Sequence, residues 1–567
     1  MAKPRTLRNL AAAATAALAL ALTACGGGGG ASGPATGSSS ASGADAGALS
    51  TGTITAFGSV FVNGHEFATG GARVIDDDSG NSVAASSLEV GMVVDVKAAA
   101  ASSASHPQAA ELRLHPLARG YVDASSSDAG TITVMGQTVQ LTSATNYSDH
   151  RACVSASTGA CAAVTGQSGL VANAGTGSSY VTVHGYLFTG SAGSTNIVAT
   201  LVSVGDLPAS GIAFKAEGMV SAVGTNSVTI GALTADLASA TCRVKGATVP
   251  CANAFGTGQV VAVGAATLAD ALPVTTFSAG FARLAGKLPV ETDGATVELE
   301  GSVSSVGSGS FVLRGITVDA SALVTAGTAL PSVGDIVRVT GTVASNGQSV
   351  TATALKVIHL ASARTYGLEG DASGVAAGSA ADTYTLSLLG QTVTVNAGTR
   401  LADRQSRGWM HSDPATNPFN IGTFQAYLAA SASQHLLVVA QTDAGGNLVA
   451  QSLVILPAST AATIAGPVDA TPAPVNSSAT GTPTTFSVHG VAVSADPAAI
   501  FAGRFGEHGR GGGGGGSSSG GVTIAAGETV VVRGSYAGGT VTVGATPSAT
   551  NAVVDLGTLE RRDRCGL

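Results

Sequence analysis

Residues 51–97 begin TGTITAFGSVFVNGHEF (51–67) and end SSLEVGMVVDVK (86–97), and they contain the pattern that the rest of the chain repeats. Apolar and polar residues alternate in both halves, which is the period of a half-buried β-strand. Asn63-Gly64 supplies the positive φ that a two-residue hairpin turn requires. The stretch predicts three strands in a meander and then, after a polar connection, two more: 52–57, 59–62, 65–68, 92–97 and 109–114.

The same pattern returns until there are six copies, with one glycine starting the first strand and another ending the second. The first glycines are Gly52, Gly120, Gly218, Gly301, Gly370 and Gly466, and the second are Gly64, Gly136, Gly231, Gly315, Gly390 and Gly490. A Val-rich fourth strand returns at 258–263, 334–339 and 527–532. In copies two and five it is degenerate, and the best matches are Tyr180–Val183 and Phe424–Leu428.

These recurrences divide the chain into six predicted β-repeats between an N-terminal leader and a short tail. The leader is a signal peptide (1–24) followed by a lipidated Cys and a tether rich in Gly, Ser and Ala (25–50). The repeats cover 51–116, 117–205, 214–288, 296–360, 365–457 and 462–557, and the tail covers 558–567. Insertions at 153–161, 404–419 and 503–521 fall between third and fourth strands, so we expect surface loops there.

Three strands, a connection and two further strands is also the strand order of the OB-fold, a small five-stranded barrel. We therefore expect an all-β chain of tandem OB-like barrels. Small β-sandwiches remain the alternative, because period-two patterning does not distinguish the two. Aromatic residues are only 4% of the chain, so the cores must consist mainly of Val, Leu, Ile and Ala.

The charge balance bears on the binding partner. The formal net charge is −8, and only 11% of residues are charged. Nucleic-acid binding requires basic grooves. The sequence therefore predicts no nucleic-acid partner.

The N-terminus predicts export and lipid anchoring. Lys3, Arg5 and Arg8 precede an apolar run at 10–22, which is too short to span a bilayer but fits a signal peptide. The run ends in Leu22-Thr23-Ala24-Cys25, which resembles the lipobox of bacterial lipoproteins. The resemblance implies that Cys25 carries lipid and anchors the chain in the cell envelope, and Gly26 after it implies the outer membrane of a Gram-negative bacterium.

The other cysteines agree with an oxidising compartment. Cys153 and Cys161 lie close in sequence, as do Cys242 and Cys251, so we expect two loop-closing disulfides. Their spacings lack the Cys-x-x-Cys unit of zinc sites, and we expect no metal and no cofactor. Cys565 is left over in the C-terminal tail, and its role stays open.

Residues 57–64 (FGSVFVNG) and 88–96 (LEVGMVVDV) resemble the repeated domain of exported bacterial proteins known as domain of unknown function 5666. The resemblance is close in the first copy and looser in the others. It implies an envelope lipoprotein built from tandem small β-domains. It carries no catalytic residue that could be transferred to this chain.

Candidate catalytic or metal sites are weak. Residues 76–81 (DDDSGN) have the carboxylate density of a calcium loop but lack the EF-hand ligand pattern, so a solvated turn is the preferred interpretation. Residues 516–520 match Gly-x-Ser-x-Gly only within a low-complexity run, and His65-Glu66 lacks the second His of a zinc-protease motif. His184 and His489 each precede a glycine and are interpreted as turn residues.

The fifth repeat concentrates aromatic residues near its insertion. Four rings are candidates for contact with a sugar or protein: Trp409, Phe419, Phe424 and Tyr427. Packing of the insertion against its own barrel is the alternative, and the one we favour.

Together these features predict a non-enzymatic envelope lipoprotein that acts as a spacer, scaffold or ligand-binding array. Its partners would be the membrane, through lipid, and a cell-wall or surface glycan or a protein. One alternative is a surface adhesin or carbohydrate-binding protein. A second is a secreted hydrolase with a site in the inserted loops, although acidic residues there, such as Asp403, Asp413 and Glu507, are too scattered to nominate a pair.

Overall fold

The structure is a computed structural model in which most of the repeat region is described. Cys25, Trp409, Cys565, the signal peptide, nearly all of the tether, the glycine-rich loop and the tail lie outside the described residues. The described residues are 49–57, 59–99, 107–126, 130–141, 145–155, 161–164, 166–172, 177–189, 195–244, 246–268, 272–285, 288–289, 292–345, 347–359, 364–378, 382–403, 419–429, 434–443, 445–479, 481–502, 522–548 and 550–555.

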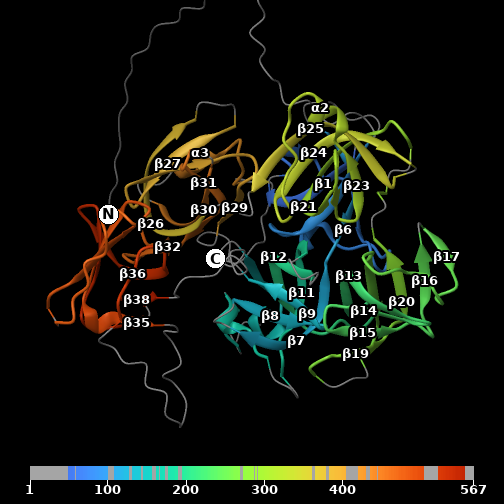
Figure 1. Ribbon diagram of the computed structural model, residues 1–567, viewed down its shortest axis with the longest axis horizontal. Coiled ribbons are helices and arrows are strands. Elements are labelled where there is room, and N and C mark those ends of the chain that lie inside the picture. Colours follow the sequence, from blue (N-terminus) through green and yellow to red (C-terminus); the bar gives the residue numbers. More distant parts are fainter. Residues whose placement is uncertain are drawn as a thin grey trace, which may run out of the picture. The chain divides into compact units, whose positions relative to one another are not determined.

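Repeat 1 contains all five predicted strands and one short extra strand. Figure 1 draws this repeat in blue. Its elements are β1 (Leu49–Ala56), β2 (Val60–Val62), β3 (His65–Phe67), β4 (Arg73–Asp76), the 3-10 helix η1 (Ala85–Ser87), β5 (Val93–Ala98) and β6 (Ala109–Leu114). Asn63 and Gly64 both have positive φ, 57° and 86°, as the predicted hairpin requires. The extra strand β4 continues β3 after a break and pairs in parallel with β6.

Repeats 2 and 3 follow the same order of elements. Repeat 2 has β7 (Ala118–Ser126), β8 (Thr131–Val134), β9 (Gln137–Gln140), β10 (Asn146–Asp149), α1 (Ala152–Ser155), the 3-10 helix η2 (Gln167–Gly169), β11 (Tyr180–Thr189) and β12 (Thr195–Gly205). Repeat 3 has β13 (Phe214–Gly224), β14 (Ser227–Ile230), β15 (Leu233–Asp236), β16 (Thr241–Val244), β17 (Ala247–Val249), β18 (Val260–Ala265), β19 (Thr276–Ser278) and β20 (Phe281–Leu284).

The last three repeats keep the order, with a short helix before the fourth strand in each. Repeat 4 has β21 (Thr296–Val306), β22 (Ser310–Leu313), β23 (Ile316–Asp319), α2 (Ser321–Thr325), β24 (Ile336–Ala344) and β25 (Ser349–His359). Repeat 5 has β26 (Thr365–Ala377), β27 (Tyr384–Leu388), β28 (Gln391–Val395), β29 (Arg400–Asp403), α3 (Phe424–Ala429), β30 (Gln434–Thr442) and β31 (Leu448–Leu456). Repeat 6 has β32 (Ala462–Pro467), β33 (Thr484–Val488), β34 (Val491–Ala495), the 3-10 helix η3 (Pro497–Ala499), β35 (Ile500–Ala502), β36 (Thr529–Ala537), β37 (Thr540–Val543) and β38 (Ala552–Asp555).

Strand pairing closes repeats 4 and 5 into five-stranded barrels. In repeat 4 the ring runs β21-β22-β23-β25-β24 and back to β21, and β23 pairs with β25 in parallel. Repeat 5 forms the equivalent ring from β26, β27, β28, β31 and β30. The order one, two, three, five, four is that of a five-stranded Greek-key barrel, so the expectation of OB-like barrels is confirmed.

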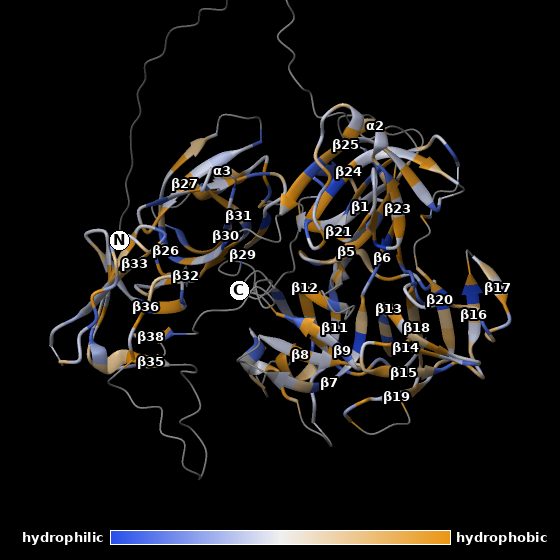
Figure 2. Cartoon of the chain, in the orientation of Figure 1, coloured by the Kyte–Doolittle hydropathy of each residue, from blue (hydrophilic) through white to orange (hydrophobic). Residues whose placement is uncertain are grey.

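Buried and less buried residues alternate along several strands, and Figure 2 shows hydrophobic and hydrophilic residues interspersed along the strands. In β24, buried Val337, Val339 and Val343 alternate with less buried residues such as Arg338. Because a strand's side chains point alternately to the two faces, these valines fill the barrel while Arg338 points outward. The cores of the described residues consist mainly of Val, Leu, Ile and Ala, as the composition predicts.

The repeats are joined in pairs through their first strands. β1 of repeat 1 pairs in parallel with β21 of repeat 4, at Leu49–Thr51 against Val297–Leu299. β7 pairs with β13, and β26 pairs with β32, each antiparallel. Each resulting sheet, of 11, 14 or 13 strands, therefore contains the strands of two repeats.

Two sequence interpretations are wrong. Phe424–Leu428 is not the fourth strand of repeat 5, because it lies in helix α3 and the fourth strand is β30. Phe424 and Leu428 are four residues apart, on one helix face, and both are buried. His184 is not at a turn: it lies within β11 beside a register shift, and it is buried. His489 does occupy the β33–β34 turn, with φ of 45°.

Candidate functional site

The outer face of repeat 1 carries a cross-strand row of polar residues. The register pairs Thr51 with Asp95 and Asp95 with Arg113, so the three side chains lie side by side on β1, β5 and β6. Thr51 Oγ1 donates a hydrogen bond of 2.8 Å to Asp95 Oδ1. Asp95 is only 6% exposed although it points away from its own barrel. Other repeats therefore cover this row.

His115 follows β6 and lies between two carboxylates. Its Nε2 is 2.7 Å from Asp95 Oδ2, and its Nδ1 is 3.4 Å from Asp77 Oδ2. Burial alone would lower the pKa of His115, but the charges of Asp95 and Asp77 outweigh it and raise that pKa to about 9. His115 is therefore an imidazolium at neutral pH.

The sequence analysis interpreted the carboxylates at 76–78 as part of a solvated turn, and this interpretation is wrong. Asp76 Oδ1 accepts the backbone N–H groups of Asp78 and Ser79, each at 3.0 Å, which fixes the turn. The Asp78 side chain is fully buried against Lys215 Nζ of repeat 3, at 2.8 Å, and Lys215 is fully buried too. The sequence reading failed because the partner cations lie far away in the chain.

Arg283 on β20 completes this contact between repeats 1 and 3. Its Nη1 is 2.7 Å from Asp77 Oδ2, and its Nη2 is 3.0 Å from Asp78 Oδ1. Burial would raise the pKa of Asp78, but Lys215 and Arg283 outweigh it and hold the pKa below its ordinary value. Repeats 1 and 3 thus meet through ion pairs whose charges are held out of water.

Arg314 of repeat 4 reaches the same place from the β22–β23 hairpin. Arg314 and Gly315 have φ of 49° and 79°, which is the geometry of a tight two-residue turn. Arg314 Nη1 is 3.2 Å from Asp95 Oδ1. We call the cluster from the three repeats the charged junction; its members are Asp77, Asp78, Asp95, Arg113, His115, Lys215, Glu217, Arg283 and Arg314.

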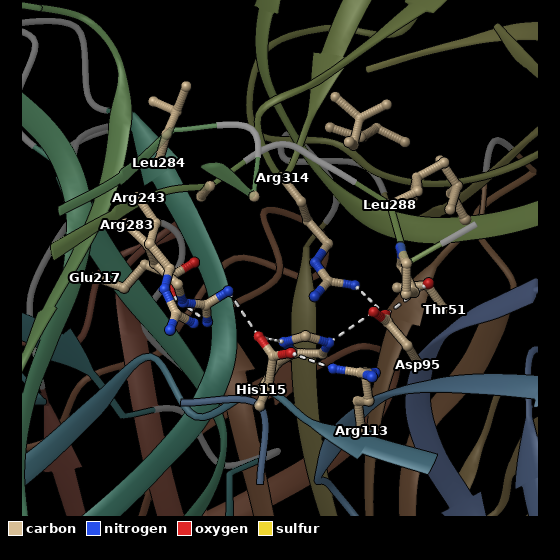
Figure 3. Close-up of a pocket in the computed structure, with 17 residues that line it drawn as sticks. Thr51, Asp95, Arg113, His115, Glu217, Arg243, Arg283, Leu284, Leu288 and Arg314 are labelled. Atoms are coloured by element: carbon tan, nitrogen blue, oxygen red, sulfur yellow. Dashed lines mark hydrogen bonds and ion pairs between the residues drawn. The ribbon is translucent and has the colours of Figure 1, made fainter. Parts of the chain in front are cut away.

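A cavity of about 330 Å³ opens beside the charged junction (Figure 3). The lining includes charged groups, among them Asp95, His115 and Arg283, and apolar side chains such as Leu284 and Leu288. Its lining comes from repeats 1, 3 and 4 and the segment that links repeats 3 and 4: Thr51, Asp77, Asp95, Arg113, His115, Glu217, Arg243, Gly246, Arg283, Leu284, Ala285, Leu288, Pro289, Leu299, Leu313, Arg314 and Ile316.

A second polar contact links repeats 1, 2 and 4. Tyr186 on β11 donates a hydrogen bond of 2.8 Å to Glu300 on β21, and its hydroxyl is 2.5 Å from Thr53 Oγ1. Arg338 Nη2 lies 2.8 Å from Glu300 Oε2. Nearby, His184 Nδ1 accepts the Val93 N–H at 3.3 Å, and burial lowers the pKa of His184 to about 3. His184 is therefore neutral, unlike His115.

Sequence reasoning missed these charged residues, although a signal for some of them was present. The residue before the marker glycine of the first strand is Glu217, Glu300 or Glu369 in repeats 3, 4 and 5. Glu217 and Glu300 make ion pairs with Lys215 and Arg338, and Glu369 Oε1 lies 3.4 Å from His435 Nε2. The recurrence of glutamate at this position of the first strand is therefore a sequence signal for the outward-facing row of polar residues.

The predicted aromatic candidates lie in the core where they are described. Phe419 and Phe424 are 8% and 0% exposed and stack with their ring centroids 5.9 Å apart. Tyr427 is partly buried and hydrogen bonds to Asp403. These positions agree with packing against the barrel, the interpretation favoured above.

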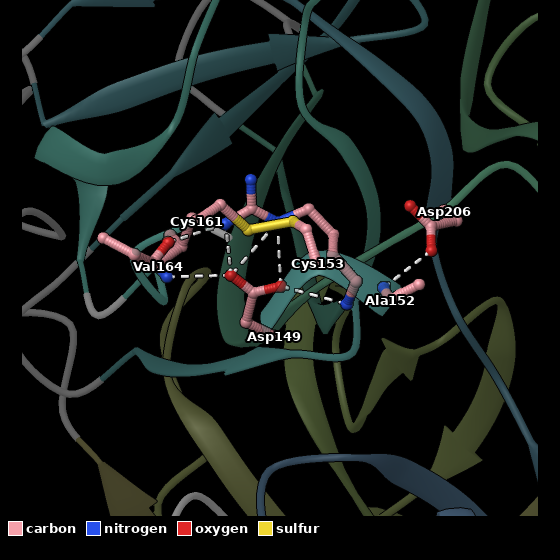
Figure 4. The surroundings of a disulfide bond; sticks show 8 residues. Asp149, Ala152, Cys153, Cys161, Val164 and Asp206 are labelled. Atoms are coloured by element: carbon pink, nitrogen blue, oxygen red, sulfur yellow. Dashed lines mark hydrogen bonds and ion pairs between the residues drawn. A yellow bond between two sulfur atoms is a disulfide. The ribbon is translucent and has the colours of Figure 1, made fainter. Parts of the chain in front are cut away.

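The two predicted disulfides are present, Cys153–Cys161 and Cys242–Cys251. Asp149 organises the loop around the first one (Figure 4). Its carboxylate accepts hydrogen bonds from the Arg151 guanidinium, at 2.6 and 2.9 Å, and from the Val164 N–H at 2.8 Å. Burial raises the pKa of Asp149, but these hydrogen bonds outweigh it and lower the pKa.

The fold and these junctions define a class of protein: a chain of small β-repeats joined in pairs through their first strands, with repeats 4 and 5 closed into OB-like barrels. The model of DUF5666, a domain of unknown function, matches residues 51–105, 119–187 and 300–356. The chain therefore carries tandem DUF5666 domains, in repeats 1, 2 and 4. Repeats 3, 5 and 6 share the strand order outside those matches.

A search of curated proteins finds no relative of the chain. No described helix is long and apolar enough to cross a membrane. Within the described ranges, no three His, Cys, Asp or Glu side chains are grouped so as to hold a metal ion.

Proposed function

We propose that this chain is a non-enzymatic lipoprotein of the cell envelope whose β-barrels form a joined scaffold at the membrane. The observation that carries the scaffold proposal is the pairing of barrels through their first strands. Backbone hydrogen bonds across two barrels restrict their relative motion, whereas flexible linkers would leave barrels independent.

Repeat 1 supports the same proposal, because it contacts four other repeats. It shares a sheet with repeat 4 and buries ion pairs with repeat 3. Asn146 of repeat 2 donates to Val90 O at 3.2 Å, and Phe61 packs in the core cluster of repeat 5. A repeat held on several sides suits a spacer or scaffold that keeps its shape.

The carboxylates of the charged junction support a non-enzymatic role. A general acid needs a carboxyl group whose pKa is raised towards neutrality. Burial would raise the pKa values of Asp77, Asp78 and Asp95, but their cationic neighbours outweigh it and hold those values low. They therefore act as fixed anions that hold repeats together.

The membrane anchor rests on the sequence Leu22-Thr23-Ala24-Cys25. The two disulfides suit the oxidising compartment that such an anchor implies. We expect wild-type protein in the outer-membrane fraction. Cys25→Ser should move it to the soluble fraction or leave its signal peptide uncleaved. Globomycin, which blocks signal-peptide removal from lipoproteins, should leave wild-type precursor, and release of unlipidated full-length wild-type protein into the periplasm would refute the anchor.

The scaffold is tested separately, on the soluble chain lacking residues 1–25. Small-angle scattering should give one radius of gyration that stays unchanged between low and moderate salt. A radius that grows as in a chain of independent beads would refute the scaffold.

A further inference from the structure

In each repeat, one edge of the first strand is shared by two partners, and the marker glycine separates them. In repeat 1, Ile54 follows Gly52 and pairs with β2 of the same repeat, whereas residues 49–51 precede the glycine and pair with β21 of repeat 4. In repeat 6, Val468 pairs with the end of β33, whereas residues 463–465 pair with β26 of repeat 5. The other four repeats follow the same rule. The partner repeat therefore begins where the repeat's own second strand ends.

The two-residue turn between the second and third strands lies at this boundary, and we call its first residue the pairing residue. The pairing residue has a φ between 45° and 57° in five repeats: Asn63, Met135, Arg314, Leu389 and His489. Bulky residues rarely adopt such values, and a two-residue hairpin turn favours Asn-Gly. A Met, Arg, Leu or His kept at this strained position indicates that its side chain makes a compensating contact.

The marker glycine provides the space for the pairing residue. A Cβ atom on Gly120 would lie only 2.9 Å from Met135 Cγ, and a Cβ atom on Gly301 would lie 3.3 Å from Arg314 Cγ. Any larger residue at these glycines would therefore displace the side chain of the turn. The glycine and the turn together place that side chain beside the part of the first strand that pairs with the partner repeat.

From this position, the pairing residue reaches the partner repeat. Arg314 Nη1 of repeat 4 lies 3.2 Å from Asp95 Oδ1 of repeat 1 (Figure 3). The His489 ring of repeat 6 packs on the Tyr366 ring of repeat 5, with the centroids 4.6 Å apart. In both cases the repeat that is contacted is the one that pairs through the first strand.

Repeats 2 and 3 show the contact when one pairing residue has no side chain. Repeat 3 has Gly231 at this position, and Gln137 of repeat 2 covers it, with Nε2 donating to Ile230 O at 2.7 Å. In the other direction, Met135 of repeat 2 is buried in the same core cluster as Phe214 of repeat 3. The two turns of this pair are therefore complementary, one large and one small.

We propose that the pairing residue determines which repeat joins which, through a contact that matches the outer chemistry of the partner. Arg314 fits a partner with a carboxylate in its row, Met135 fits an apolar partner, and His489 fits one that presents an aromatic ring. This inference rests on the proposed scaffold and names the side chains that give it its order.

Hydrogen exchange of two variants of the soluble chain lacking residues 1–25 tests the proposal. Arg314→Asn installs the residue that the turn itself prefers, yet it should speed exchange at 49–51 and 297–299 at least about tenfold and leave 463–465 unchanged. His489→Asn should do the reverse, with faster exchange at 463–465 and none of the effect at 49–51. Each variant is thus the control for the other.

Two further measurements separate pairing from the turn. The amides at 310–313 should exchange as slowly in Arg314→Asn as in wild type, since asparagine suits the turn. Asn253→Gly changes an exposed residue with φ of 60° and should leave both pairings unchanged. Wild-type exchange at 49–51 in Arg314→Asn, equal loss at both pairings, or faster exchange at 310–313 would overturn the proposal. Fast exchange at 49–51 in wild type would instead refute the scaffold itself.

Discussion

Repeats 1 and 6 have the same strand order, yet equivalent positions on their outer faces differ in chemistry. In repeat 1 the row across first, fourth and last strands is Thr51, Asp95 and Arg113. In repeat 6 the row is Ala465, Val531 and Val554. The core of each repeat requires apolar residues only at the inward-facing positions. The outward-facing residues can therefore differ between repeats, according to the neighbouring repeat that covers them.

The covering neighbours explain the difference. Repeat 1 meets repeats 3 and 4 through Asp78, Asp95 and their cationic partners, all largely shielded from water. Repeat 6 meets repeat 5 mainly through β32 and a shared apolar core that includes Ile464 and Leu368. A buried charge is costly when its partner is removed, whereas an apolar contact tolerates substitution better. This contrast leads to four predictions.

The largest effect is expected when one ion of repeat 1 is removed. Asp78→Ala leaves Lys215 buried with only Glu217 nearby, and it should lower the free energy of unfolding by about 3–5 kcal/mol. Asp319→Ala is the control: this exposed carboxylate bonds to the N–H and the side chain of Ser321, and its loss should cost about 1 kcal/mol or less. Urea denaturation followed by circular dichroism measures both. Equal losses would show that the buried pair has no special weight.

Replacing both ions should cost less than replacing one. In Asp78→Leu with Lys215→Met, the desolvation penalty of both charges disappears, so the double variant should be more stable than Asp78→Leu alone. A double-mutant cycle should give a coupling of about 0.5–3 kcal/mol. Additive losses would mean that the two side chains do not act as a pair.

The two histidines His115 and His184 should respond to pH in opposite directions. The pKa of His115, facing Asp77 and Asp95, is raised from 6.5 to about 9, so its stabilisation is complete below pH 6.5 and is lost as the pH rises through 9. The pKa of His184 is lowered from 6.5 to about 3, so its stabilisation is complete above pH 6.5 and is lost as the pH falls towards 3. Histidine ring NMR titrations, assigned with His115→Gln and His184→Gln, measure both. Two ordinary values near 6.5 would contradict the buried junction.

The smallest effect compares first strands directly. Thr51→Val removes the hydroxyl that donates to Asp95 and should cost about 1 kcal/mol. Ala465→Thr, at the equivalent position of repeat 6, should change stability by less than about 0.5 kcal/mol. Thermal unfolding of both variants gives the comparison, and a reversed order would contradict the difference between the rows.

Local patterns predicted the strands well and the contacts between repeats poorly. The turn at Asn63-Gly64 and the strands of repeat 1 depend on neighbours in sequence, so alternation and turn chemistry suffice to find them. The Asp78–Lys215 pair joins residues 137 positions apart, and nothing near Asp78 reveals the lysine. Phe424–Leu428 misled because five mostly apolar residues fit a short helix as well as a strand.

Hydrogen exchange at Leu49–Thr51 tests the joined-barrel account most directly. These residues pair with β5 on one side and with β21 of repeat 4 on the other. Mass spectrometry of the soluble chain lacking residues 1–25 should find the amides of β1 and β21 exchanging as slowly as those of β24 inside its own barrel. Fast exchange at Leu49–Thr51, as at a free sheet edge, would show that repeats 1 and 4 are not joined and would contradict the account.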